Sequence, residues 1–451
     1  MNPPSSKWRT QLYPATAMLS GLILAQIIAT VHVYFSNRSL YHTLTAIHGA
    51  GYLTVPNQQT MGRLQELTTA LCGGIFFTLS VGTGICLLSF SAAWLWDRVF
   101  FRKTVFLVLM LLLWAGLTAG VNLRGFSPFT SLYFFVIPPV VFAGTLKWVP
   151  HGNRKRPWRM GLLHVILIMI LGLLWAPQMK KDLFHDIRDL LLVSNPPGER
   201  IVDFYYRYTL YPAEVLKSLD RKLLKTCTLN TIPDGPFKSE LQKNLSAHDW
   251  IETENLEGVD LVLTGSGNEL LLNDGNGTVL KIPKEDFLAH PTANLKRFSS
   301  TADRHVFFRQ FTFYSLLMGF PVTLYIFFYS LVFLILGRWI KPGIASPASA
   351  GLCFSAGLLM LMPLWQNSGQ EPARELRVSG SNETYEDIVN LLEDPSPSVV
   401  SAALSALGRR GEKRAVPKIL RLIKASDHWY VQWYAYKALK ALGWQQKKRG
   451  P

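Results

Sequence analysis

Long apolar runs, separated by short polar and basic connections, dominate the hydrophobic pattern of the chain. The clearest run is 160–176, which contains no charged residue and follows a basic cluster at 154–159. A run of about 17 or more apolar residues is long enough to cross the roughly 30 Å hydrocarbon core of a bilayer. The pattern therefore predicts a mainly α, polytopic α-helical membrane protein.

Seven runs have the length and composition of a membrane-spanning helix. Five lie in residues 1–179, and two more lie in residues 305–366, after a long polar segment. The runs are 15–35, 68–96, 104–121, 129–146, 160–176, 311–336 and 349–365.

The cations of the short connections predict the orientation of these spans, because short loops rich in Lys and Arg stay in the cytoplasm. With the N-terminus inside, twelve of these cations are cytoplasmic and three are outside. The inner ones are Lys7, Arg9, Arg98, Arg102, Lys103, Lys147, Arg154, Lys155, Arg156, Arg159, Arg338 and Lys341. The outer ones are Arg38, Arg63 and Arg124. The N-terminus is thus expected in the cytoplasm and the C-terminus outside. No eukaryotic targeting signal is recognised, so we expect a bacterial inner membrane.

The second span carries a small residue at every fourth position. The residues are Ala70, Gly74, Thr78, Gly82 and Cys86. Such a stripe lets another helix approach closely, so Gly74, Thr78 and Gly82 are predicted to pack against a neighbouring helix. The alternative is that the stripe lines a substrate path.

Prolines inside two other spans suggest kinks or breaks. Pro138-Pro139 lies in the span 129–146, and Pro321 lies in 311–336. A broken helix can mark a transport site, because its freed carbonyl groups need partners. A structural kink is the commoner reading.

The polar segment 180–304 has the size of one small domain. Three short strand-like runs occupy its second half, and NDGNG between the last two is typical of a hairpin turn. These runs are 259–265, 269–274 and 278–283. Residues 180–192 and 212–225 show helical signals. The segment is expected to be an α+β extracytoplasmic domain, in which the tyrosines of 205–211 serve in anchoring, packing or ligand contact.

Residues 380–445 contain a repeated helical pattern. Its matching residues are Asp394-Pro395, Val399, Ala403, Ala406-Leu407-Gly408, Arg414-Ala415-Val416-Pro417, Ala438 and Ala441-Leu442-Gly443. The pattern resembles a pair of HEAT-type repeats, of the short kind similar to phycobilisome-lyase-like repeats. The resemblance implies an α-α repeat unit that binds proteins and is not itself a signature of catalysis.

Two repeats are fewer than the three or so that a free solenoid needs to bury its faces, so this unit is expected to lean on the membrane domain, the segment 180–304 or another subunit. Its last helix has one inward face, formed by Val431, Ala435, Ala438, Leu439 and Leu442. A separate aromatic stripe contains Trp429, Tyr430, Trp433, Tyr434 and Tyr436. Exposed Trp and Tyr are typical binding anchors, so this stripe is predicted to bind a protein partner.

Basic residues accompany the aromatic stripe in the repeat unit. Arg409, Arg410 and Arg414 belong to a cluster that faces few acids. They are predicted to contact an acidic partner or lipid headgroups, and the alternative is a solvated helix face.

Composition agrees with a chain that is partly in lipid. Of its 451 residues, 49% are hydrophobic and 17% are charged, and the formal net charge is +16. Nucleic acid is not expected as a partner, because much of the positive charge lies in short loops beside the spans. Three of the four cysteines fall inside apolar runs, so no disulfide framework is expected.

Catalytic, metal and cofactor motifs are missing from the sequence. None of GxSxG, HExxH, a Walker loop or CxxCH occurs. The two intramembrane histidines, His32 and His164, lie on the order of 15–20 Å apart in depth at about 1.5 Å per residue, too far to ligate one iron. We therefore assign no catalytic residue, metal or cofactor.

The favoured function is a non-catalytic membrane scaffold that recruits a protein partner through its outer domains. The first alternative is a permease or lipid-handling transporter with kinked spans. The absence of charged residues at mid-membrane depth counts against an ion-driven transporter. The second alternative is a membrane enzyme built from outer-loop residues such as His42, His48 and Asp203.

Overall fold

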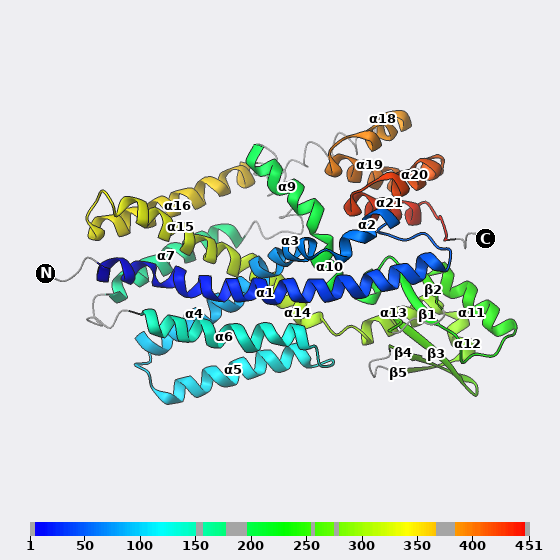
Figure 1. The fold of residues 1–451 in the computed structure, drawn as a ribbon, viewed down its shortest axis with the longest axis horizontal. Helices are drawn as coiled ribbons and strands as arrows, with labels where there is room; N and C mark the ends of the chain where they lie inside the picture. The colour runs from blue at the N-terminus through cyan, green and yellow to red at the C-terminus, as the bar shows by residue number, and fades with distance from the viewer. Residues whose placement is uncertain are drawn as a thin grey trace. The chain divides into compact units, whose positions relative to one another are not determined.

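A computed structural model describes residues 5–149, 157–176, 196–253, 258–274, 279–366 and 384–446. The chain is mainly helical (Figure 1). It forms two compact units. Unit 1 consists of Met1–His32, Gly74–Asp203 and Val306–Gln370. Unit 2 consists of Val33–Gly73, Phe204–His305 and Glu371–Pro451. Each unit is therefore assembled from three segments that are far apart in the sequence.

Unit 1 is built from long apolar helices. It contains parts of α1 (Ser5–Gly49) and α3 (Leu67–Phe77), then α4 (Thr83–Arg98), α5 (Thr104–Asn122), α6 (Pro128–Trp148), α7 (Pro157–Trp175), α14 (Val306–Tyr314), α15 (Phe320–Leu336) and α16 (Pro342–Gln366). Six helical segments among the described residues are long and apolar enough to cross a membrane. They are Leu12–Gly49, Leu67–Arg98, Thr104–Asn122, Pro128–Trp148, Val306–Leu336 and Pro342–Met362. The predicted span 160–176 corresponds to a shorter apolar stretch, Leu162–Trp175.

Helix α1 is longer than the predicted first span. It continues to Gly49, well beyond the end of the predicted span 15–35. Leu44 and Ile47 keep an apolar face at helical spacing and are buried, so the amphipathic pattern outlasts the apolar run. The helix ends where Gly51 adopts a positive φ of 85°.

Two π-helical segments interrupt the helices of unit 1. Segment η2 (Thr78–Gly82) lies between α3 and α4, and η6 (Ser315–Gly319) lies between α14 and α15. The interruption that Pro321 suggested is therefore a π-helical turn directly before it, a known cause of helix bending. By contrast, α6 continues as a helix through Pro138-Pro139, so of the kink or break that these prolines suggested, a break does not occur.

A five-stranded sheet forms the centre of the described insert in unit 2. Its strands are β1 (Lys225–Thr228), β2 (Trp250–Glu252), β3 (Leu261–Ser266), β4 (Glu269–Asn273) and β5 (Val279–Pro283), in the order β2-β1-β3-β4-β5. Strand β1 pairs in parallel with β2 and β3, whereas β3, β4 and β5 form an antiparallel meander. The last three strands lie in the runs that the sequence predicted, and part of the expected NDGNG turn is outside the described residues.

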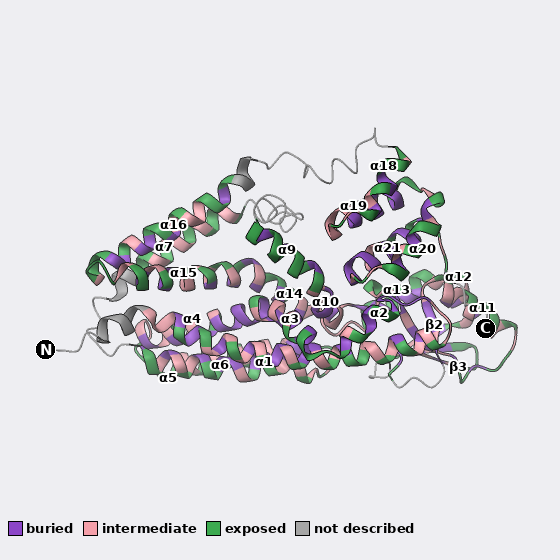
Figure 2. Cartoon of the chain, turned by 45° about the horizontal axis from the view of Figure 1, so that its top comes forward, coloured by how far each residue is buried: buried purple, intermediate pink, exposed green. Residues whose placement is uncertain are grey.

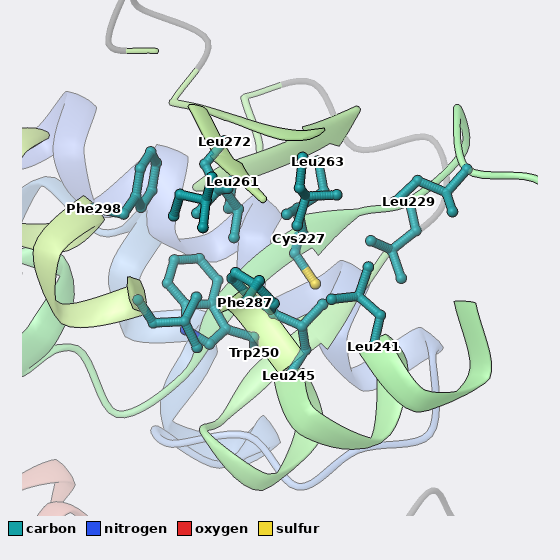
Figure 3. Packing of buried hydrophobic residues seen from close by; sticks show 14 residues of the cluster. Cys227, Leu229, Leu241, Leu245, Trp250, Leu261, Leu263, Leu272, Phe287 and Phe298 are labelled. Atoms are coloured by element: carbon teal, nitrogen blue, oxygen red, sulfur yellow. The ribbon is translucent and has the colours of Figure 1, made fainter. Parts of the chain in front are cut away.

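Helices α11 (Pro236–Ala247), α12 (Lys284–Ala289) and α13 (Pro291–Thr301) supply the other side of the core of the insert. Figure 3 shows this core, in which Leu241, Phe287 and Phe298 from these helices meet Cys227 and Leu263 from the strands. Burial raises the pKa of the Cys227 thiol, which agrees with a packing role for this side chain.

The expected helix 212–225 is wrong in its second half. Helices α9 (Pro196–Tyr208) and α10 (Leu210–Leu216) are followed by a short 3-10 turn, and Lys225 already belongs to β1. In this region the Lys222 Nζ donates to Asp260 Oδ1 at 2.7 Å. The predicted helix 180–192 lies outside the described residues.

The C-terminal repeat unit is a pair of helical hairpins. It contains α18 (Tyr385–Asn390), α19 (Pro397–Arg410), α20 (Val416–Ala425) and α21 (Trp429–Ala441). Thr384 and Asp387 form a capping box at the start of α18, and Gly411 ends α19 with a positive φ of 70°. Gly408 permits close helix packing, since a Cβ there would lie 3.4 Å from Ala438 Cα.

Candidate partner-binding surface

The inward face of α21 forms as the sequence predicted. All five of its residues are buried: Val431, Ala435, Ala438, Leu439 and Leu442. They pack within the repeat unit, where α21 contacts both α19 and α20. The helical spacing of apolar residues therefore identified this face from the sequence alone.

The aromatic stripe of α21 packs against the chain's own insert. The rings of Trp429 and Tyr211 have centroids 5.0 Å apart at an interplanar angle of 74°, and those of Tyr430 and Tyr206 are 4.4 Å apart at 63°. Such edge-to-face pairs add about 0.5–1.5 kcal/mol beyond area burial. The stripe thus joins α21 to α9 and α10 inside unit 2.

The expectation that this stripe is exposed is wrong for three of its five residues. Trp429, Tyr430 and Tyr436 are buried, with exposed fractions of 5%, 9% and 0%. Trp433 and Tyr434 are half-buried, and the Lys437 amine lies 4.3 Å from the Trp433 ring centroid. The physical reason is that a two-repeat unit has too little interior of its own, so its last helix also buries its second face. Partner binding by these residues stays a prediction.

Asp249 connects the repeat unit to the sheet. Its Oδ1 accepts a hydrogen bond from Tyr436 Oη at 2.9 Å and pairs with Lys440 Nζ at 3.0 Å. Its backbone carbonyl accepts from the Lys225 amide at the start of β1. Burial, followed by the negative charge of Asp249, raises the pKa of Tyr436 and keeps the phenol protonated.

The segment between α1 and α3 contacts the end of α20 and the start of α21. Asn57 Nδ2 donates to the carbonyls of Ile423, Lys424 and Ser426 at 2.9, 3.1 and 2.9 Å. These carbonyls lie at the C-terminal end of α20, where a helix leaves its last acceptors unsatisfied. Asn57 therefore caps a helix that is more than 360 residues away in the sequence.

Two glutamines complete this attachment. Gln432 accepts from the Asn57 amide at 2.7 Å and donates to Thr60 Oγ1 at 3.0 Å. Gln446 accepts from the Leu53 amide at 3.1 Å and donates to the Leu53 carbonyl at 2.8 Å. Buried amide side chains that make paired bonds fix the register of two segments. Sequence reasoning missed Asn57, Gln432, Gln446 and Asp249, because no local pattern signals a bond across such a separation.

The repeat unit also carries a set of exposed cations. We call this set the basic ridge; its members are Arg409, Arg410, Lys413, Arg414, Lys418, Arg421 and Lys424. They lie at the end of α19, in the 3-10 turn Lys413–Ala415 and on the face of α20 opposite the buried Ile419 and Ile423, whereas much of α21 is buried (Figure 2). Three of the predicted site residues therefore lie on an exposed surface: Arg409, Arg410 and Arg414.

The small-residue stripe of unit 1 lies against α1. A Cβ on Gly74 would come within 3.0 Å of the Thr30 backbone nitrogen, and one on Gly82 within 2.9 Å of Ala25 Cβ. Between them, Thr78 Oγ1 donates to Gln26 Oε1 at 2.7 Å. The surface of α1 therefore covers the stripe, because small residues let another helix approach closely.

The histidines considered for a metal or haem lie in different surroundings. His32 stacks between Phe77 and Phe129, with centroid distances of 5.8 and 5.2 Å. His164 Nδ1 is 3.0 Å from Tyr325 Oη. Within the described ranges, no group of three or more His, Cys, Asp or Glu side chains is arranged to hold a metal ion.

The outer-loop residues of the enzyme alternative are not a loop cluster. His42 and His48 both lie on α1, six residues apart, which corresponds to about 9 Å along the axis and to different helix faces. Asp203 is exposed on α9.

Comparison with known proteins identifies the repeat unit only. The family model of HEAT repeats matches residues 373–448. This segment therefore carries HEAT repeats, as its resemblance implied. No curated protein and no solved structure matches the chain.

Proposed function

We propose, from the HEAT repeats of residues 373–448 and the apolar helices of unit 1, that the chain is a non-catalytic multi-pass membrane scaffold. Unit 1 anchors it in the bilayer, and unit 2 recruits a protein partner on the extracytoplasmic side. The observation that carries the proposal is a HEAT pair attached on one side to its own chain and exposed on the other.

Exposed apolar side chains on unit 1 support the membrane assignment. In α5, Val105, Leu112 and Leu113 are 76%, 64% and 67% exposed, and Leu173 in α7 is 71% exposed. Large apolar surfaces of this kind are rare on monomeric soluble proteins. In a bilayer the same side chains face lipid, and the helices satisfy their own backbone groups.

The composition of unit 2 supports seven spans over six. Its segments Val33–Gly73, Phe204–His305 and Glu371–Pro451 pack in one unit, so they lie on one side of a bilayer. Between one of these segments and the next, the chain must then cross the bilayer an even number of times. Between the first two segments, the α3–α4 helix, α5 and α6 give three crossings, and α7 supplies the fourth. Between the last two segments, α14–α15 and α16 give two.

The orientation follows from the cations of the short connections. Their excess on one side puts the N-terminus in the cytoplasm, and unit 2 then lies outside. In a bacterium this is the periplasmic face of the inner membrane, where a scaffold meets soluble and membrane-bound partners.

The HEAT repeats favour a protein as the recruited molecule, because such repeats present extended surfaces for protein binding. Since α21 is covered by α9, α10 and residues around Asn57, the surface left for a partner is that of α18, α20 and the end of α19. The insert adds further exposed surface beside it within unit 2.

The permease alternative depends on a polar path through unit 1. Where η6 meets the start of α4, the helices are in close contact: a Cβ on Gly319 would lie 2.9 Å from Gly84 Cα. This contact leaves no room for a substrate at that point. The scaffold reading therefore fits unit 1 better.

Site-specific photo-crosslinking tests the proposal. A benzophenone amino acid at exposed Ala425 on α20 should give a protein adduct in cells, and the same group at exposed Trp339, on the expected cytoplasmic side, should not give that adduct. Mass spectrometry of the adduct identifies the partner. Adducts with lipid alone at Ala425, or no adduct there, would contradict the scaffold function.

A further inference from the structure

The basic ridge concentrates positive charge on one face of the HEAT pair. Residues 409–424 contain seven cations and a single carboxylate, Glu412, which lies 3.2 Å from Arg414. The next carboxylate along the chain, Asp427, pairs with Arg63 at 3.7 Å and with His428 at 3.6 Å. Residues 409–424 therefore carry a formal net charge of +6.

Helix α20 gives the ridge a defined shape. Lys418, Arg421 and Lys424 project from one exposed face of about 120°, because residues three apart differ by about 60° around a helix. The buried Ile419 and Ile423 hold the opposite face against the repeat unit. Ten residues of helix span about 15 Å, which about five residues of an extended chain would cover.

The surroundings of the ridge favour a protein segment over a lipid surface. Helices that lie on membranes insert exposed Trp, Phe or Leu side chains beside their cations. Among residues 384–446 there is no large exposed hydrophobic side chain, and the aromatic residues of α21 are turned toward the chain's own insert. Four of the seven cations are arginines, whose planar guanidinium groups bind carboxylates in a bidentate manner.

We propose that the basic ridge is the docking site for an acidic, carboxylate-rich extended segment of the partner protein. This inference rests on the proposed scaffold function and names the chemistry of the partner. Side-chain carboxylates at alternate positions of the segment would face the ridge, because side chains of an extended chain alternate.

The test uses the purified full-length chain in neutral detergent and a fluorescein-labelled decapeptide with glutamate at alternate positions. Fluorescence polarisation should show binding that weakens with salt, because surface charge pairs are screened. The same peptide with glutamine in place of glutamate should not bind. Vesicles of phosphatidylcholine with phosphatidylglycerol, in a flotation assay, form the lipid arm.

A charge-matched pair of variants separates the ridge from net charge. The ridge variant combines Lys418→Glu, Arg421→Glu and Lys424→Glu. The control combines Lys243→Glu, Lys281→Glu and Arg297→Glu, which are exposed cations of the insert. The ridge variant should bind the acidic peptide about tenfold more weakly or worse, and the control within about twofold of the parent. Both variants should unfold at the parent's temperature, since all six side chains are exposed.

Three results of the binding experiments would overturn the inference. They are equal loss of binding in both variants, no peptide binding by the parent, and ridge-dependent binding of vesicles without peptide binding. Failure of the proposed function looks different, because it appears as no protein adduct at Ala425. If a protein adduct forms there and the ridge variant retains it undiminished, the scaffold function stands and the acidic partner class is wrong.

Discussion

At the scale of single residues, Asn57 shows how one side chain can hold distant segments together. Its Oδ1 caps α2 (Gln58–Met61) by accepting from the Thr60 amide at 3.0 Å, while its Nδ2 serves the end of α20. The side chain is buried, with an exposed fraction of 7%. Both the Oδ1 acceptor and the Nδ2 donor of Asn57 are therefore used. A substitution can remove one of them and keep the other.

Asn57→Asp keeps the acceptor for Thr60 and removes the donor to Ile423, Lys424 and Ser426. Buried carbonyls that lose their donor and face a carboxylate should destabilise unit 2 by about 1–3 kcal/mol. Urea unfolding of the full-length chain in detergent measures this. The same change at exposed Asn230 is the control and should have little effect. Equal stabilities of the two variants would contradict the capping role.

Buried phenols make the attachment of the repeat unit sensitive to alkali. Burial raises the pKa of Tyr211 from 10.0 to about 12. A group with a raised pKa contributes stability that is fully present below pH 10 and is lost as the pH rises through about 12. Tyr211→Phe keeps the ring against Trp429 and removes this titration. Between pH 9 and pH 12, the unfolding temperature should therefore fall less steeply with pH for the variant than for the parent. Identical slopes of unfolding temperature against pH would argue against a buried Tyr211.

At the scale of elements, α21 is a helix with two buried faces. One face packs on α19 and α20, and the other contacts Tyr206 and Tyr211 of the insert. If a substitution in this helix abolished partner binding, there would be two explanations. It could remove a direct contact with the partner, or it could destabilise unit 2.

Trp429→Ala separates these explanations. Removal of a buried Trp side chain should destabilise unit 2 by about 3–5 kcal/mol. Lys418→Ala on the exposed face of α20 should stay within about 0.5 kcal/mol. The unfolding midpoints of both variants check this. If Trp429→Ala is as stable as the parent, its side chain is not the internal anchor described above.

Packing of the small-residue stripe on α1 is tested with Gly74→Val. The added side chain would meet Thr30 and Ala29 backbone atoms at 3.0 and 3.2 Å, so it should destabilise unit 1 by about 1–3 kcal/mol. Gly116→Val on α5 is the matched control, because no atom lies within 4 Å of its Cβ position. Thermal unfolding in detergent compares the two. A Gly74 variant no less stable than the Gly116 variant would exclude close packing at this position.

At the scale of the whole molecule, the proposed seven-span topology predicts which positions an impermeant reagent can reach. Single cysteines at Arg38, Lys243 and Lys418 should react with an impermeant maleimide from the same, outer side. Cysteines at Lys103 and Lys341 should react only after permeabilisation. All five positions are exposed. Labelling of Arg38 and Lys418 positions from opposite sides would rule out the seven-span topology.

Local patterns predicted most of what is local in this fold. The inward face of α21 and strands β3, β4 and β5 follow from the spacing of apolar residues, which is a property of each segment. Strands β1 and β2 escaped prediction because three or four residues are too few to show a period. Their extended state depends on parallel pairing, as between Thr226 and Ile251.

The aromatic stripe shows the limit of such patterns. Spacing separated it correctly from the inward face, but spacing cannot tell an exposed second face from one that is covered by another segment. Tyr206 and Tyr211 were also recognised as part of a cluster, yet nothing local pairs them with Tyr430 and Trp429. That pairing required the tertiary structure.

The amino-acid sequence by itself determined the long apolar helices, the charge bias of their connections, the sheet-containing insert and the HEAT repeats. Each of these depends on hydrophobicity, charge or spacing within one segment. The tertiary structure alone decided that Asn57, Asp249 and Tyr211 hold the repeat unit and that the basic ridge remains exposed. These outcomes depend on which distant segments share one unit, and hydrogen bonds across hundreds of residues leave no trace in local composition.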